Sequence, residues 1–169
     1  MSQIIFEPFK WNDDIFIRKS HNCYSYALNI IEKKRSSKCR EKNNKKKSIC
    51  LRKQPNNISK KYEFHNCGEL INNILREYPE VKRTTKNSRC PEGFYRVALF
   101  LLNRKDNHHL TLNDFHFYRQ DSNGFWSHKD GWRKATNKDK YGRLIRDPEI
   151  VENENESKLC GYFIFPIKK

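Results

Sequence analysis

The chain has 169 residues, of which 36% are hydrophobic and 33% are charged, and its formal net charge is +15. This length allows one domain with a real core, and 11 Phe, 8 Tyr and 3 Trp supply much of the apolar surface. The sequence excludes a membrane-spanning helix, because no apolar run approaches the roughly 18 residues that a span needs.

The N-terminal residues lack the basic start and apolar stretch of a secretion signal, so we expect an intracellular protein. Its basic residues are concentrated in one segment. Residues 33–62 hold 13 Lys or Arg and one acid, a net charge of +12, which leaves only +3 for the rest of the chain. Such a segment is typical of a solvated loop or a flexible arm.

In chain order, residues 1–20 contain short apolar groups that we expect to cross the core in extended form. "SHNCYSYALNIIEKK" then predicts an amphipathic helix, because Tyr24, Ala27, Leu28 and Ile31 recur at helical spacing. Asn22 is a favoured N-cap residue and would put Cys23 in the first turn, with Ser20 as the alternative cap. Residues 35–60 show no sustained period, and we expect a basic loop insertion there.

A second helix is predicted for "HNCGELINNILREYPE", ending at Pro79. "GFYRVALFLLN" at 93–103 is a nearly continuous apolar run and predicts a buried strand. A β-hairpin follows at 114–121 and 124–129, and "LCGYFIFPI" closes the chain as a last core strand. The predicted fold class is α+β: two helices packed on an antiparallel β-meander, in one domain over residues 1–169.

Cys23 is the first candidate catalytic residue. A cysteine in the first turn of a helix feels the partial positive charge of unpaired backbone N–H groups, which favours the reactive thiolate. The alternative is that Cys23 only packs in the core, as free cysteines often do.

The hairpin "DFHFYRQDSNGFWSHK" carries one histidine on each arm, His116 and His128. Alternation places Asp114, His116 and Tyr118 on one face of the first arm, and Asn123-Gly124 suits the positive φ angles of a tight turn. If the register is right, His128 lies near His116. Such a pair could bind a metal, or one histidine could act as a general base that the other orients. His116 could also be a half-buried histidine bonded to a carbonyl.

A cysteine that opens a helix, a histidine on a strand, and a second histidine twelve positions later resemble the NlpC-type branch of the papain-like cysteine hydrolases. "HNCYSYAL" resembles that family's "DCSG" nucleophile turn, with Asn22 in place of Asp. The resemblance implies a papain-like fold with Cys23 as nucleophile, His116 as general base and His128 as the orienting residue. "HFYRQDSNGFWSHK" also resembles proteins of giant DNA viruses, which would place the chain in the host cytoplasm or the virion.

These residues predict a cysteine hydrolase or acyltransferase that acts on an amide, isopeptide or ester bond of a peptide, protein conjugate or acyl substrate. The backbone N–H of Cys23 is the candidate oxyanion donor, and Tyr24, Tyr118 and Trp126 are candidate residues of the substrate cleft. We expect no cofactor and no metal. Zinc ligation by Cys39, Cys50, Cys67 and Cys90 with His65 lacks a CxxC pair, so free thiols are the favoured interpretation.

Two alternatives remain open at the level of sequence. The chain could be an accessory protein that binds nucleic acid through the basic 33–62 segment, or a catalytically inactive relative of the hydrolases. The sequence gives no oligomeric state.

Overall fold

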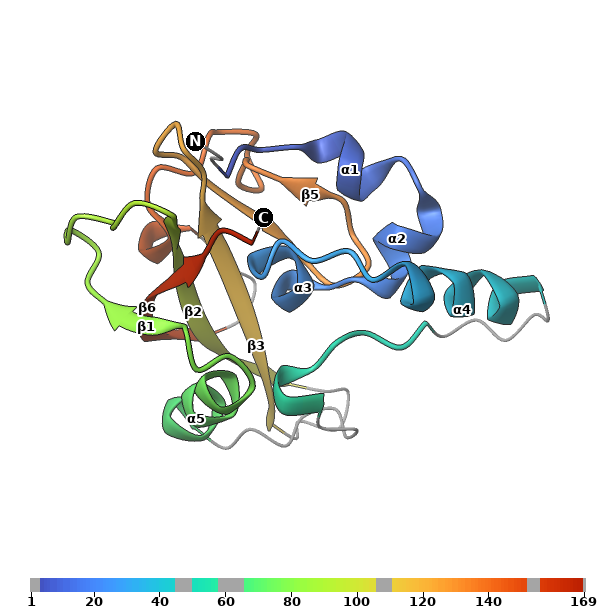
Figure 1. Cartoon of the computed structure of the whole chain (residues 1–169), viewed down its shortest axis with the longest axis horizontal. Helices are drawn as coiled ribbons and strands as arrows, with labels where there is room; N and C mark the ends of the chain where they lie inside the picture. The colour runs from blue at the N-terminus through green and yellow to red at the C-terminus, as the bar shows by residue number, and fades with distance from the viewer. Residues whose placement is uncertain (1–3, 45–49, 58–65, 106–110, 152–155, 169) are drawn as a thin grey trace.

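The computed structural model describes residues 4–44, 50–57, 66–105, 111–151 and 156–168. The fold is α+β, as predicted, and in the described residues it combines a six-stranded antiparallel sheet with five α-helices (Figure 1). None of the helices in these ranges is long and apolar enough to cross a membrane.

The strands of the sheet follow the order β1-β6-β2-β3-β4-β5, and every neighbouring pair is antiparallel. Their bounds are Lys82–Thr84 (β1), Phe94–Lys105 (β2), Thr111–Gln120 (β3), Trp126–Lys129 (β4), Ala135–Thr136 (β5) and Glu156–Pro166 (β6). The predicted meander holds for β2, β3 and β4, and β5 was not predicted. The last strand instead lies between β1 and β2, and β1 was not predicted.

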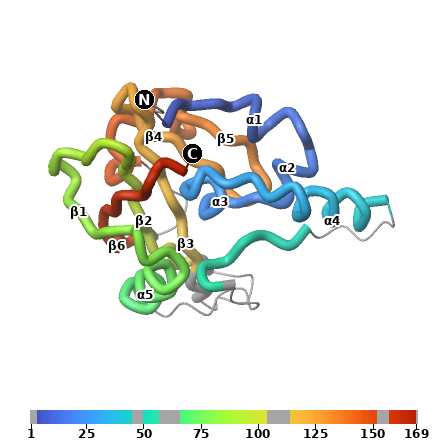
Figure 2. Tube along the Cα trace, in the orientation of Figure 1, coloured from blue at the N-terminus to red at the C-terminus, as the bar shows by residue number. Residues whose placement is uncertain are grey.

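The helices are α1 (Pro8–Asn12), α2 (Ile15–Ser20), α3 (Cys23–Ala27), α4 (Lys33–Asn44) and α5 (Cys67–Glu77), with 3-10 turns at Pro55–Asn57 and Pro148–Ile150. α5 matches the second predicted helix, and the Asn66 side chain caps it by accepting from the Glu69 N–H at 2.9 Å. The Cα trace shows α4 extending away from the sheet, whereas α3 lies close to β3 (Figure 2).

The sheet has two packed faces, and alternation along β3 divides its side chains between them as predicted. On one face, Phe115 and Phe117 belong to the main core, which α3 and α5 cover with residues such as Tyr24 and Leu70. On the other face, Tyr118 packs in a second cluster with Ala98, Phe100, Leu102, Trp126, Ile145 and Tyr162.

Several local expectations are wrong. Residues 8–12 and 15–20 form α1 and α2 instead of extended segments. The helix expected to run from Cys23 to Ile31 ends at Ala27, because Asn29 adopts a left-handed backbone with φ 54°. The helix start is correct: Asn22 is the N-cap, and its side chain accepts from the Ser25 N–H.

The expectation of an irregular basic loop at 35–60 is also wrong for much of its length. Residues 33–44 form α4, and Cys39, Cys50 and Lys53 are buried. Lys53 Nζ forms an ion pair with Glu77 of α5 at 2.6 Å, and its backbone carbonyl accepts from the Asn22 side chain at 2.8 Å. The described residues 50–57 are therefore held against the core, and deleting them would destabilise the fold more than deleting an unpacked loop would.

Four of the six cysteines form disulfides, Cys39–Cys50 and Cys67–Cys160, which corrects the expectation of free thiols. The first joins α4 to the segment that follows it, and the second joins the start of α5 to β6. Cys23 and Cys90 are the free cysteines.

Candidate functional site

The hairpin brings the two histidines together. Asp121 and Phe125 close the turn, and Gly124 takes the left-handed conformation with φ 84°, whereas Asn123 does not adopt the positive φ we expected for it. Tyr118 lies directly opposite His128 in the register of β3 and β4. His116, two residues before Tyr118, therefore projects on the same face as His128.

The contact between these histidines is a hydrogen bond, because Nε2 of His116 lies 2.8 Å from Nδ1 of His128. Their ring planes are nearly perpendicular, and the ring centroids are 5.0 Å apart. The Tyr118 ring lies 4.8 Å from both. The predicted approach of the two histidines on one face is thus present in the structure.

The hydrogen-bond partners of His128 assign its tautomer. Burial lowers the pKa of His128 to about 4, against the opposing effects of Asp130 and of a backbone hydrogen bond with Lys138, so the ring is neutral at physiological pH. A bond to a backbone carbonyl requires an N–H of the ring, and Nδ1 already faces His116. We therefore assign the proton to Nε2 of His128, which makes Nδ1 the acceptor.

This assignment has a consequence for His116. Its Nε2 must then donate to His128, so in the neutral ring the lone pair is on Nδ1, the nitrogen nearer to its own backbone. A histidine whose ring is oriented by a hydrogen bond to a second side chain is an arrangement that general bases use.

Cys23 lies at the edge of β3 beside the residues that flank His116. Its thiol donates to the Phe115 carbonyl with Sγ 3.7 Å away, and a backbone hydrogen bond from Phe117 also acts on the sulfur. β4 pairs with β3 only from Tyr118 to Gln120. The edge of β3 at Phe115 and Phe117 is therefore not paired with β4, and it is this edge that Cys23 contacts. The sulfur thus lies next to the backbone on either side of His116.

The reactivity expected for Cys23 differs from what the structure shows. Its side chain is only 4% exposed, and burial, with a smaller effect of Asp114, raises the pKa of the thiol well above its ordinary value. The prediction that the helix start would favour the thiolate is therefore wrong for the resting protein, since α3 has five residues and desolvation outweighs it.

Lys129 is a residue of this site that sequence reasoning missed. Its fully buried ammonium donates to the carbonyls of Arg18, His21 and Gly131 at 2.6, 2.7 and 2.7 Å. Burial lowers the pKa of Lys129 to about 7, whereas three carbonyl acceptors match the three donors of the charged form. Strand alternation could have identified this residue, because it places the Lys129 side chain on the opposite face of β4 from His128, toward the interior.

The candidate cleft residues are placed in the core. Tyr24, Tyr118 and Trp126 are exposed by 2% or less. Tyr24 donates to Glu77 at 2.9 Å, and Trp126 packs on Tyr162. Their expected role as residues of the substrate cleft is therefore wrong for the resting structure.

Zinc ligation, which the sequence did not favour, is excluded for three of the cysteines, because Cys39, Cys50 and Cys67 are in disulfides and cannot act as thiolate ligands. No group of three or more His, Cys, Asp or Glu within the described ranges could hold a metal ion. His65, the histidine considered with these cysteines, lies outside these ranges.

Two hollows on the described surface are lined by other residues. The larger, of about 660 Å³, lies at the turn end of the hairpin, where Cys90, Arg96 and Gln120 contribute to its wall. The second lies along α4. Neither of these two is lined by Cys23, His116 or His128. Because the Cys23 side chain is buried, a substrate can reach the sulfur only if the residues that cover it move.

Comparison with known proteins gives a distant match. The chain is 29% identical over 158 residues to insoluble matrix shell protein 1 of Ruditapes philippinarum, which spans 93% of this chain and 86% of that protein. No family model matches the chain, and no solved structure matches it.

Proposed function

We propose that the chain is a cysteine hydrolase or acyltransferase with a papain-like arrangement of Cys23, His116 and His128. The observation that carries the proposal is the hydrogen bond between the two histidines, with the sulfur of Cys23 beside the backbone that flanks His116. His128 is the proposed orienting residue, and in the proposed reaction Nδ1 of His116 takes the proton from the thiol.

In the proposed reaction the Cys23 thiol proton moves to Nδ1 of His116 as the sulfur attacks a substrate carbonyl. The C–S bond forms while the carbonyl π electrons move to oxygen, and the backbone N–H of Cys23 is the candidate donor to that oxyanion. Collapse of the intermediate breaks the bond to the leaving amine or alcohol, which receives the proton from His116. Water or an acceptor amine then cleaves the thioester by the same route.

The raised pKa of Cys23 sets a condition on this reaction. In the resting protein the sulfur is a thiol whose proton is shared with the Phe115 carbonyl, so proton transfer to His116 has to accompany substrate binding. Catalytic hydrogen bonds often tighten only in the substrate complex. This condition would be met by a substrate that displaces the residues burying Cys23, whether a peptide, a protein conjugate or an acyl ester.

The test is capture of the acyl-enzyme. Activated esters and peptidyl amides are incubated with Cys90→Ser protein, and an adduct on Cys23 is sought by intact mass and peptide mapping. We expect an adduct that Cys23→Ala and His116→Ala eliminate and that His128→Asn reduces less strongly, because an orienting residue contributes less than the nucleophile or base. An adduct that persists in His116→Ala at the parent rate would contradict the proposed triad.

A second candidate function is that of a non-catalytic matrix protein. The observations that favour it are the match to a shell matrix protein and the burial of Cys23. Under this proposal no ester or amide would acylate Cys23, and the histidine pair would serve the stability of the hairpin.

We also propose that the chain acts in an oxidising compartment, in contrast to the intracellular location expected from the sequence. Disulfides persist in secreted proteins and are rare in reducing compartments, and the structure contains two. The measurement is the redox state of these pairs in protein isolated from its source under conditions that trap thiols.

A further inference from the structure

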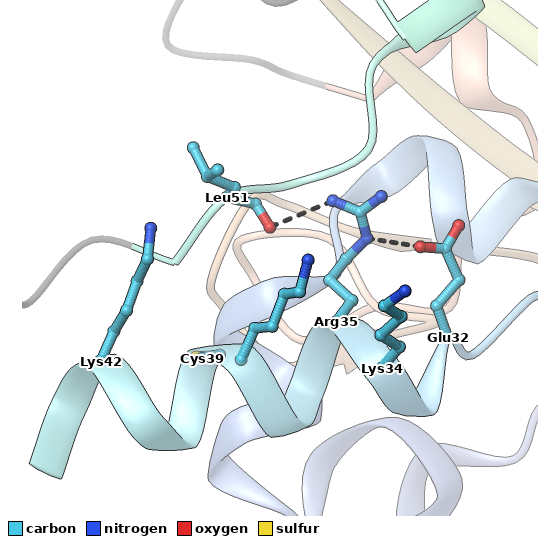
Figure 3. A pocket seen from close by; sticks show the side chains of 7 residues that line it. Glu32, Lys34, Arg35, Cys39, Lys42 and Leu51 are labelled. Carbon is cyan, nitrogen blue, oxygen red and sulfur yellow. Dashed lines mark hydrogen bonds and ion pairs between the residues drawn. The ribbon is translucent and has the colours of Figure 1, made fainter.

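We infer that the face of α4 next to Leu51 is a binding site for a linear sulfated polysaccharide. Three lysines of α4, Lys34, Lys38 and Lys42, follow one another at intervals of four residues and line a hollow of about 360 Å³. In Figure 3 the side chains of Lys42 and Arg35 rise from α4 toward the segment that carries Leu51. This inference does not depend on the proposed hydrolase.

The lysine row is a line of positive charge, and the acid in the described lining of the hollow, Glu32, pairs with Arg35 and Lys53. Residues four apart on a helix lie on one face and are separated by about 6 Å along its axis. No described acidic side chain forms an ion pair with Lys34, Lys38 or Lys42, whereas Arg35 pairs with Glu32 at 2.7 Å. A polymer with regularly spaced anionic groups could therefore contact all three ammonium groups at once.

The wall opposite the helix is held in place. The Cys39–Cys50 disulfide joins the middle of α4 to the residue before Leu51, and Arg35 donates from Nη1 to the Leu51 carbonyl at 3.3 Å. Leu51 itself is 69% exposed. The hollow is thus built between two segments fixed by a covalent bond, so a ligand need not order them on binding.

The chemistry of this face favours sulfate groups on a sugar chain over the phosphates of a nucleic acid. The described residues that line the hollow include no aromatic side chain on which bases could stack. Lysine-rich patches of this kind also bind heparin, and disulfides indicate an oxidising compartment.

The test compares two triple variants that remove the same charge. The site variant is Lys34→Gln/Lys38→Gln/Lys42→Gln, and the control is Lys82→Gln/Lys134→Gln/Lys158→Gln, whose lysines are exposed elsewhere. Binding of a fluorescent heparin oligosaccharide and of a single-stranded oligonucleotide of equal charge is measured by anisotropy at several salt concentrations. Circular dichroism checks that each variant is folded.

We expect the site variant to bind heparin at least about 10-fold more weakly than the control. The slope of its log binding constant against log salt concentration should be shallower by about two to three, since each lost contact releases roughly one counterion fewer. Equal losses in both variants would overturn the inference, because binding would then follow net charge alone. Tighter binding of the oligonucleotide than of heparin, lost in the site variant, would assign this face to nucleic acid and would also overturn it.

Discussion

Lys129 donates a hydrogen bond from Nζ to the backbone carbonyl of His21, 2.7 Å away and two residues before Cys23. The same ammonium also binds the carbonyls of Arg18 and Gly131. The residue that follows His128 on β4 is thereby tied to the segment that leads into α3, so the histidine pair and the cysteine are held by one buried group.

We therefore predict that Lys129→Met lowers the free energy of unfolding by about 2–4 kcal/mol, because three buried carbonyls lose their donor. Urea denaturation followed by tryptophan fluorescence measures the change. The exposed Lys134→Met is the matched control and should stay within about 0.5 kcal/mol of the parent. Equal stabilities of the two variants would show that Lys129 does not hold these segments together.

The lowered pKa of His128 predicts a pH dependence of stability. The folded protein keeps the ring neutral down to about pH 4, whereas the unfolded chain protonates it near its ordinary pKa of about 6.5. The unfolded state binds more protons in this window, so stability falls as pH decreases from about 6.5 to 4, by on the order of 3 kcal/mol from this group.

The measurement is urea unfolding of the parent and of His128→Asn at a series of pH values. The difference between their free energies of unfolding should narrow as pH falls through the window, since the carboxylates that titrate near pH 4 are common to both proteins. A difference that stays constant from pH 6.5 to 4 would mean that His128 is not held neutral.

The two disulfides should differ in their contribution to stability. Cys67–Cys160 closes a loop with a sequence separation of 93, and Cys39–Cys50 one of 11. Loop-closure entropy then predicts that the free energy of unfolding falls by about 4–5 kcal/mol in Cys67→Ser/Cys160→Ser and by about 3 kcal/mol in Cys39→Ser/Cys50→Ser. Thermal unfolding of both double variants checks the order, and the reverse order would contradict it.

Thiol counting provides the control for that experiment. In denaturant without reductant only Cys23 and Cys90 should react with a thiol reagent, and all six cysteines should react after reduction. Six reactive thiols before reduction would contradict the pairing.

Local patterns predicted the elements that pack a regular apolar face. The stripe of α5, the apolar run of β2 and the alternation of β3 each gave the correct element, because burial requires that periodicity. The approach of His116 and His128 was predictable for the same reason, since strand alternation and a short turn leave few registers.

The remaining features depend on contacts that no local pattern records. α4 has a single buried residue, Cys39, and its position follows from a disulfide whose pairing cannot be deduced from the sequence. The end of α3 depends on the left-handed backbone at Asn29. Cys23 is buried because it packs against Phe115 and Phe117, which are distant in the sequence. This burial reverses the expected direction of its pKa shift.

The rate at which Cys23 is alkylated tests the proposed site most directly. In a Cys90→Ser background Cys23 is the single free thiol, and iodoacetamide modification is followed by mass spectrometry in the parent, His116→Ala and His128→Asn. We predict slow alkylation of the parent, because the thiol is buried, and a further decrease of at least about 10-fold in His116→Ala, since the base that accepts the proton is lost. His128→Asn should lie between them. An unchanged or faster rate in His116→Ala, with the fold intact, would contradict the assignment of His116 as the base for Cys23.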